Sequence, residues 1–130
     1  MNKFVYYSFW FILVGIILGA FGAHAFKDFL SPEKLASYEV GVRYQLYVGI
    51  IGLILTLNHT HFDKKSFKIG TGLLFFGGLL FSGSIYLLTF IEAGLLKKIA
   101  IPLTPLGGLS IICSMFLYGL SYYKANKNIK

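Results

Sequence analysis

The sequence contains little charge, and this scarcity excludes an ordinary soluble domain. Only 13% of its 130 residues are charged, whereas 56% are hydrophobic. Four runs contain no Asp, Glu, Lys or Arg, and each approaches or exceeds the ~20 residues that cross a bilayer: 4–26, 44–62, 69–91 and 99–123. Because lipid cannot satisfy free backbone groups, we expect these runs to be helices. A soluble protein with four buried helices would need more polar residues to cover its surface.

Cysteine and the common catalytic motifs are also scarce. Cys113 is the single cysteine, so neither an intrachain disulfide nor a CxxC pair can form, which excludes four-span thiol oxidoreductases. No run carries a central carboxylate to anchor a proton-coupled drug site. We find no nucleophile elbow, phosphate-binding loop or intramembrane histidine pair. His59, His61 and Asp63 lack a fourth metal ligand, so we interpret them as part of a solvated loop. The sequence favours a non-enzymatic protein with no cofactor and no metal.

The expected fold is all-α: an integral membrane protein whose residues 1–130 form one domain with four transmembrane helices in two hairpins. A short interfacial helix should lead into the second span, because Ser31 and Pro32 supply a helix cap and a proline in the first turn. Thr104 and Pro105 repeat this pattern, so we expect the last helix to begin near Pro105. The expected spans are residues 4–26, 40–60, 69–91 and 104–123.

The basic residues predict an orientation. If all four runs cross the membrane, both termini share one side, where the Lys residues outnumber the Lys and Arg residues of the other side. The two sets are Lys3, Lys64, Lys65, Lys68, Lys124, Lys127 and Lys130, against Lys27, Lys34, Arg43, Lys97 and Lys98. Since Lys and Arg concentrate in cytoplasmic loops, we expect both termini in the cytoplasm. The net charge of +7 then meets lipid head groups rather than nucleic acid.

The N-terminal run also has features of a signal peptide, with Lys3 before an apolar stretch and small residues at Ala23 and Ala25. A signal peptide has an apolar region of only ~7–15 residues, and this run is longer. We therefore expect it to be retained as the first span.

Polar groups concentrate in residues 19–47, where Arg43 is the leading candidate for a functional residue. It is the only arginine and stands just before an apolar stretch. An arginine at membrane depth needs a carboxylate, phosphate or carbonyl partner. One hypothesis is a ligand-binding site around Arg43, and the other is a structural ion pair with Glu39, one helical turn earlier. The other residues expected at such a site are His24, Gln45, Ser82, Tyr86 and Thr104.

His24 has a second interpretation. Histidine changes charge near neutral pH, so His24 is a candidate general base. No nucleophile or metal accompanies it in the sequence, and the simpler interpretation is a hydrogen-bonding group at the membrane interface.

Three motifs carry a family resemblance: GAFGAHAFKDFLSPEKLASYEVGVRYQLY at 19–47, FSGSIYLL at 81–88 and LTPLGG at 103–108. With them the chain resembles the YgdD-like family of small bacterial membrane proteins, which has relatives in animal mitochondria. The resemblance implies a four-span protein of the bacterial inner membrane and supplies no established activity. Val48 stands where the family usually carries a histidine, so the resemblance gives no support to a mechanism that needs that histidine.

Together these observations predict a non-enzymatic membrane protein. It would bind a lipid head group, a small anionic or quinone-like ligand, or a partner membrane complex, at the outer end of the helices near Arg43. The alternative is a small transporter or channel that acts as a homo-oligomer. No charged residue lines an evident pathway for that alternative.

Overall fold

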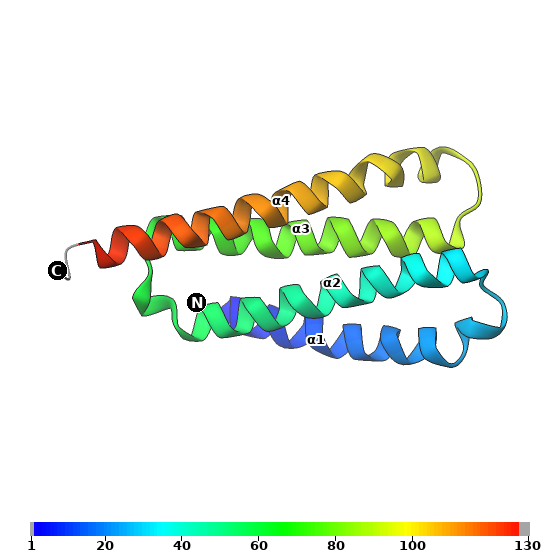
Figure 1. Cartoon of the computed structure of the whole chain (residues 1–130), viewed down its shortest axis with the longest axis horizontal. Helices are drawn as coiled ribbons and strands as arrows, with labels where there is room; N and C mark the ends of the chain where they lie inside the picture. The colour runs from blue at the N-terminus through cyan, green and yellow to red at the C-terminus, as the bar shows by residue number, and fades with distance from the viewer. Residues whose placement is uncertain (1, 128–130) are drawn as a thin grey trace.

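The structure is a computed structural model that describes residues 2–127, and these residues form helices joined by short turns. The four long helices lie side by side in chain order and alternate in direction, with both termini at the same end (Figure 1). Each is long and apolar enough to cross a membrane. The predicted all-α architecture of two hairpins is therefore confirmed. The helices are α1 (Asn2–Ala23), α2 (Pro32–Leu57), α3 (Lys64–Phe90) and α4 (Leu95–Asn126), and short 3-10 turns occupy Phe26–Asp28 and His59–His61.

The start of α2 follows the predicted local pattern. Ser31 Oγ accepts a hydrogen bond from the backbone N–H of Lys34 at 3.3 Å, and Pro32 is the first residue of the helix. From there α2 continues without a break to Leu57. The segment that we expected to lead into the second span therefore forms the first turns of α2 itself.

The prediction that the last helix begins near Pro105 is wrong. Helix α4 begins at Leu95, directly after Gly94, whose φ of 99° is strained for any residue with a side chain. Pro102 and Pro105 both lie inside the helix. Each removes one N–H donor, which membrane helices tolerate where neighbouring groups compensate. Thr104 does not cap the helix, and its hydroxyl lies 2.6 Å from Ser84 Oγ.

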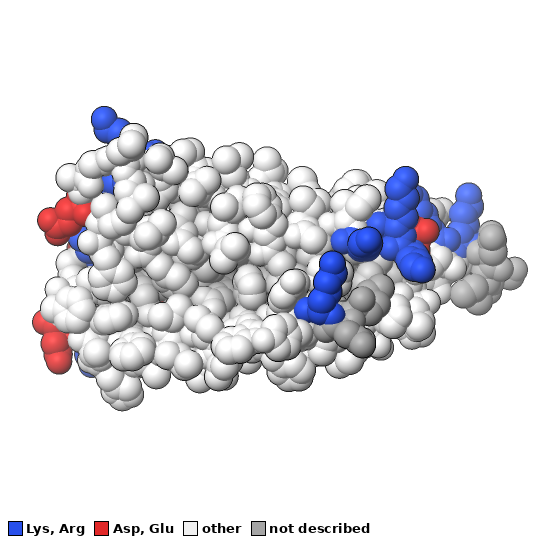
Figure 2. Space-filling view, turned by 180° about the vertical axis from the view of Figure 1, so that it is seen from behind, with Lys and Arg blue, Asp and Glu red and all other residues white. Residues whose placement is uncertain are grey.

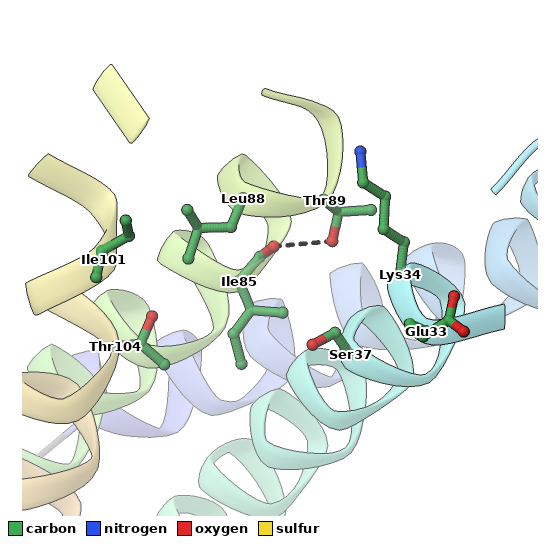
Figure 3. A pocket seen from close by; sticks show the side chains of 8 residues that line it. All are labelled: Glu33, Lys34, Ser37, Ile85, Leu88, Thr89, Ile101 and Thr104. Carbon is green, nitrogen blue, oxygen red and sulfur yellow. Dashed lines mark hydrogen bonds between the residues drawn. The ribbon is translucent and has the colours of Figure 1, made fainter. Parts of the chain in front are cut away.

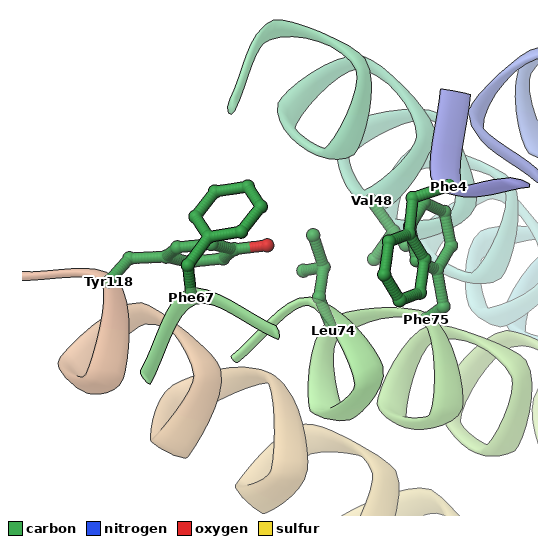
Figure 4. Close-up of a cluster of buried hydrophobic side chains, with 6 residues drawn as sticks. All are labelled: Phe4, Val48, Phe67, Leu74, Phe75 and Tyr118. Carbon is green, nitrogen blue, oxygen red and sulfur yellow. The ribbon is translucent and has the colours of Figure 1, made fainter. Parts of the chain in front are cut away.

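Contacts run between consecutive helices: α1 packs on α2, α2 on α3, and α3 on α4, with the last interface the most extensive. Figure 4 shows a cluster of buried side chains to which all four helices contribute. Within it, the rings of Phe4 and Phe75 stack with centroids 6.1 Å apart, and Tyr118 Oη donates to Thr71 Oγ1 at 2.8 Å. The cluster comprises Phe4, Val48, Phe67, Leu74, Phe75 and Tyr118.

Charged side chains gather at the two ends of the molecule. Figure 2 shows a broad band of uncharged side chains between these ends on the face that it presents. Such a band is the surface expected of a protein whose middle contacts hydrocarbon and whose ends contact head groups and water.

Candidate ligand-binding site

An apolar cavity of about 330 Å³, called here the Gln45 groove, lies where α1, α2 and α3 meet. Its walls are apolar or aromatic, apart from three polar side chains. This composition is typical of sites for small organic molecules, in which a few polar groups orient an otherwise apolar ligand. The lining residues are Trp10, Phe11, Val14 and Leu18 of α1, Gln45 of α2, and Gly78, Leu79, Ser82, Gly83 and Tyr86 of α3.

Gln45 and Tyr86 form the polar centre of this groove. Tyr86 Oη donates to Gln45 Oε1 at 2.6 Å, and Gln45 Nε2 donates to the carbonyl oxygen of Phe11 at 3.0 Å. The Gln45 side chain is thus held by α1 and α3 together, and the residue is only 7% exposed. A side-chain amide carries two N–H donors. One is used by Phe11, and the other has no partner within residues 2–127. The groove therefore offers a hydrogen-bond donor fixed in an apolar wall.

Ser82 and Gly41 hold α2 and α3 close together behind the groove. Ser82 Oγ donates to the carbonyl oxygen of Gly41 at 2.7 Å, and Ser82 is buried. A Cβ atom at Gly41 would lie 3.0 Å from Cε1 of Tyr86, so glycine allows the Tyr86 ring to lie directly against α2. The hydroxyl of Ser82 is consequently a structural tie between helices, and it positions the face of α3 that carries Tyr86.

The open space of the groove depends on Gly83. A Cβ atom at this position would have no atom within 4 Å, although Gly83 lines the cavity. By contrast, a Cβ at Gly78 would meet Val48 at 2.8 Å, so Gly78 is needed for packing. A Cβ atom at Gly83 would therefore enter open space at the groove without displacing a neighbour.

The six predicted site residues do not form one site. Gln45, Ser82 and Tyr86 come together in the Gln45 groove. Thr104 lines a different cavity, where its hydroxyl lies 2.6 Å from Ser84 Oγ, which explains why it does not cap a helix. His24 is exposed beside a shallow cavity formed by the end of α1.

Arg43 is exposed and does not line the Gln45 groove. It precedes Gln45 by two residues, which is about 200° around a helix, so the two side chains leave α2 on nearly opposite sides. The predicted ion pair between Glu39 and Arg43 is not formed: within residues 2–127 the salt bridge joins Lys34 Nζ to Glu92 Oε1 at 3.4 Å.

Sequence reasoning missed the aromatic wall and the gap in it. Trp10 lines the groove with Phe11, and neither is among the predicted site residues. The available signal was the spacing of four between Trp10, Val14 and Leu18, which places all three on one face of α1. As for metals, residues 2–127 contain no group of three or more His, Cys, Asp or Glu side chains that could hold an ion.

Comparisons with known proteins support one family. A family model described as "Protein of unknown function (DUF423)" matches residues 18–108, a range that contains all three motifs. A UPF0382 membrane protein of Staphylococcus haemolyticus is 33% identical over 112 residues, covering 86% of this chain and 88% of that protein. The UPF0382 membrane protein YwdK of Bacillus subtilis is 31% identical over 106 residues, covering 81% and 83%.

The family extends beyond bacteria. A UPF0382 membrane protein of the fission yeast Schizosaccharomyces pombe is 35% identical over 103 residues, covering 77% of this chain and 84% of that protein. No solved structure matches. The family model covers most of the chain, and these relatives align with about four-fifths of its length. The chain therefore belongs to the DUF423 family of membrane proteins, the UPF0382 membrane proteins.

Proposed function

We propose that this membrane protein is a non-enzymatic binder of an uncharged, carbonyl-bearing amphiphile of quinone-like chemistry, which enters the Gln45 groove from the surrounding lipid. The observation that supports it is the Gln45–Tyr86 pair: a buried amide with one N–H free, set in an apolar wall. A ligand carbonyl can accept that N–H. A hydrogen bond of this kind contributes about 0.5–1.5 kcal/mol net.

The walls of the groove favour a planar ring over a charged head group. Trp10, Phe11 and Tyr86 contribute three aromatic rings to its lining, and aromatic side chains pack favourably against other ring systems. Among residues 2–127, no Lys, Arg, Asp or Glu lines the groove. An anion there would lose its hydration without gaining a counter-charge, which is costly. The binding site proposed here is therefore the Gln45 groove instead of the surroundings of Arg43, and its ligand is the quinone-like class among those expected.

Trp10 gives a direct assay, because it is the only tryptophan of the chain and lines the groove. Quinones quench tryptophan emission on contact. We expect decylubiquinone to quench Trp10 saturably in the purified protein. In the variant Gly83→Leu, the added side chain would occupy the groove, and we expect the apparent affinity to fall about tenfold or more, which corresponds to about 1.4 kcal/mol.

The matched control is Gly72→Leu. Gly72 is also on α3, a Cβ there also meets no atom within 4 Å, and it does not line the groove. Both variants replace a helical glycine with a better helix former, so both should fold. If the two variants are quenched alike, or if wild-type quenching rises linearly without saturation, the groove is not a quinone site.

We also infer that the protein lies in a bacterial inner membrane with both termini in the cytoplasm. The support is the excess of Lys at the end of the molecule that carries the termini. A fluorescent protein fused to the C-terminus should be fluorescent and protected from protease in intact spheroplasts. Digestion of the fusion in intact spheroplasts would mean that the C-terminus lies outside the cytoplasm.

A further inference from the structure

A second cavity, called here the Lys34 cavity, has a volume of about 520 Å³ and is bounded by α2, α3 and α4. Figure 1 shows that α4 moves away from α3 toward the end at which α4 begins. Glu33, Lys34 and Ser37 line it from the first turns of α2, whereas Ile85, Leu88 and Ile101 line it from α3 and α4 (Figure 3). It shares no lining residue with the Gln45 groove, so it is a separate site.

The inner wall of the Lys34 cavity is effectively apolar. Two threonines line it, but the hydroxyl of each is already engaged. Thr89 Oγ1 donates to the carbonyl oxygen of Ile85 at 2.8 Å, as Figure 3 shows, and Thr104 Oγ1 is hydrogen-bonded to Ser84 Oγ at 2.6 Å. With these groups satisfied, the remaining uncharged surface, apart from the hydroxyl of Ser37, is that of the branched aliphatic side chains Ile85, Leu88 and Ile101. Such a wall suits a hydrocarbon chain.

The mouth of the cavity carries charges of both signs. Lys34 Nζ lies 3.4 Å from Glu92 Oε1, and Lys97 Nζ donates to the backbone carbonyl of Glu92 at 3.0 Å. Glu33 supplies the second carboxylate. A smaller cavity of about 400 Å³, lined by Lys34 and Glu92, continues from this mouth. The charged residues that line the two cavities are therefore Lys34, Glu33 and Glu92, and Lys97 lies beside Glu92.

The Lys34–Glu92 pair can open at little cost. The two side chains are 38% and 85% exposed. Ion pairs this exposed contribute about 0–1 kcal/mol, because water screens them and ordering two flexible side chains costs entropy. Lys34 can therefore exchange the Glu92 carboxylate for a negatively charged ligand group, and Glu92 can exchange the Lys34 ammonium for a positively charged one.

We propose that the Lys34 cavity binds a phospholipid whose head group carries both a phosphate and a primary ammonium, as phosphatidylethanolamine does. Lys34 pairs with the phosphate, and the Glu92 carboxylate accepts N–H bonds from the lipid ammonium. One acyl chain lies against Ile85, Leu88 and Ile101. A head group with only a negative charge would meet the carboxylates of Glu33 and Glu92 without offering them a cation, so this mouth selects a zwitterion.

Native mass spectrometry of the purified protein tests this selection. We would add phosphatidylethanolamine, phosphatidylcholine or phosphatidylglycerol with identical acyl chains, and soluble phosphoethanolamine in a fourth arm. We expect phosphatidylethanolamine to be retained about tenfold better than phosphatidylglycerol, a difference of about 1.4 kcal/mol. Phosphatidylcholine should fall between them, because its quaternary ammonium keeps the charge but has no N–H. Soluble phosphoethanolamine should not compete, since it lacks the chain that fills the cavity.

Two variants separate the roles of the charges. Lys34→Gln should lower the retention of every phospholipid, whereas Glu92→Gln should abolish the preference for phosphatidylethanolamine over phosphatidylglycerol. Lys27→Gln is the matched control, because Lys27 is an exposed lysine at the same end that lines neither cavity. Equal retention of the two lipids by the wild type, or equal behaviour of the Lys34 and Lys27 variants, would overturn the proposal. Competition by soluble phosphoethanolamine would show that the head group binds without an acyl chain, which would overturn the assignment as a lipid site. None of these results bears on quinone binding in the Gln45 groove.

Discussion

The two hairpins use glycine at their interfaces in different ways. In the α3–α4 hairpin, backbone meets backbone: a Cβ at Gly77 would lie 2.8 Å from the carbonyl oxygen of Gly107, and a Cβ at Gly107 would fall on the backbone nitrogen of Phe81. Two serines then bond across the gap, because Ser110 and Ser114 donate to carbonyl oxygens of α3 at 2.8 and 2.7 Å. Such close approach is available only to helices with small residues at the contact.

In the α1–α2 hairpin, glycines of α1 receive side chains of α2. A Cβ at Gly15 would meet Leu46 Cδ2 at 2.8 Å, and a Cβ at Gly22 would meet Tyr38 Cε1 at the same distance. Tyr38 is almost fully buried and donates to the carbonyl oxygen of Leu18 at 2.6 Å. At Gly15 and Gly22 the contacting atoms belong to side chains, which move more easily than the backbone of α3. The nearest backbone approach in this hairpin is looser, because a Cβ at Gly49 would lie 3.1 Å from the carbonyl oxygen of Ser8. We conclude that α3–α4 is the rigid hairpin and α1–α2 the adaptable one.

The largest expected effect comes from adding one methyl group to the rigid hairpin. In Gly107→Ala the new Cβ collides with the Phe81 backbone, so the helices must separate and lose the serine bonds. Overpacking costs about 1–3 kcal/mol and occasionally more, and we expect the upper end of that range. The measurement is the unfolding free energy in mixed micelles. Gly108→Ala is the control, because its Cβ would lie an ordinary 3.6 Å from the Phe81 ring. Equal losses in both variants would contradict the backbone-contact account.

The same change in the adaptable hairpin should cost less. In Gly22→Ala the new methyl group meets the edge of the buried Tyr38 ring, a side-chain contact that small shifts of the ring can relieve in part. The gain in helix propensity, up to about 1 kcal/mol, offsets part of the strain, so we expect a net loss of about 1 kcal/mol or less. A double-mutant cycle with Tyr38→Val tests the cause, since the alanine should then become neutral or stabilising. A loss that persists without the ring would mean that α1–α2 is as rigid as α3–α4.

The parts of the fold that could be predicted are those that lipid dictates locally. A chain surrounded by hydrocarbon must form helices, so four charge-free runs suffice to predict four helices. The cap at Ser31 was predictable because its partner, the N–H of Lys34, is three residues away. The start of α4 was not, since Thr104 and Pro105 carry the same local pattern as Ser31 and Pro32. Only the tertiary contact with Ser84 distinguishes the two positions.

The site was predictable only in part, for a geometric reason. Ser82 and Tyr86 are one turn apart and necessarily share a face of α3. That Gln45 meets them depends on the rotation of α2 about its axis, which is set by the packing of Gly41 against the Tyr86 ring. A sequence that concentrates polar residues near one end does not reveal that rotation. The charge of Arg43 therefore predicts a site on one side of α2, whereas the Gln45 groove lies on the other side of the same helix.

Asp63 should make the α3–α4 hairpin more sensitive to acid than the α1–α2 hairpin. Its carboxylate accepts the backbone N–H of Ser66 at 2.9 Å and caps α3, while its backbone exchanges hydrogen bonds with Ser121 of α4 at 3.0 and 3.2 Å. The bonds from Ser66 lower the pKa of Asp63 below its ordinary value of 3.8, and the charges of Lys124 and Lys65 add to this effect. In the α1–α2 hairpin, helix α2 is capped by the hydroxyl of Ser31, which does not titrate at acidic pH.

A carboxylate with a lowered pKa in the folded state stabilises that state above its unfolded pKa, and the contribution is lost as the pH falls through the folded pKa. We therefore expect acidification from about pH 6 to about pH 3 to reduce the hydrogen-exchange protection of residues 64–68 relative to residues 33–37. Asp63→Asn should remove this dependence, because asparagine is as good a cap and carries no proton to gain. If the two helix starts lose protection in parallel, or if the variant responds as the wild type does, the acid-sensitive tie of the α3–α4 hairpin lies elsewhere than at Asp63.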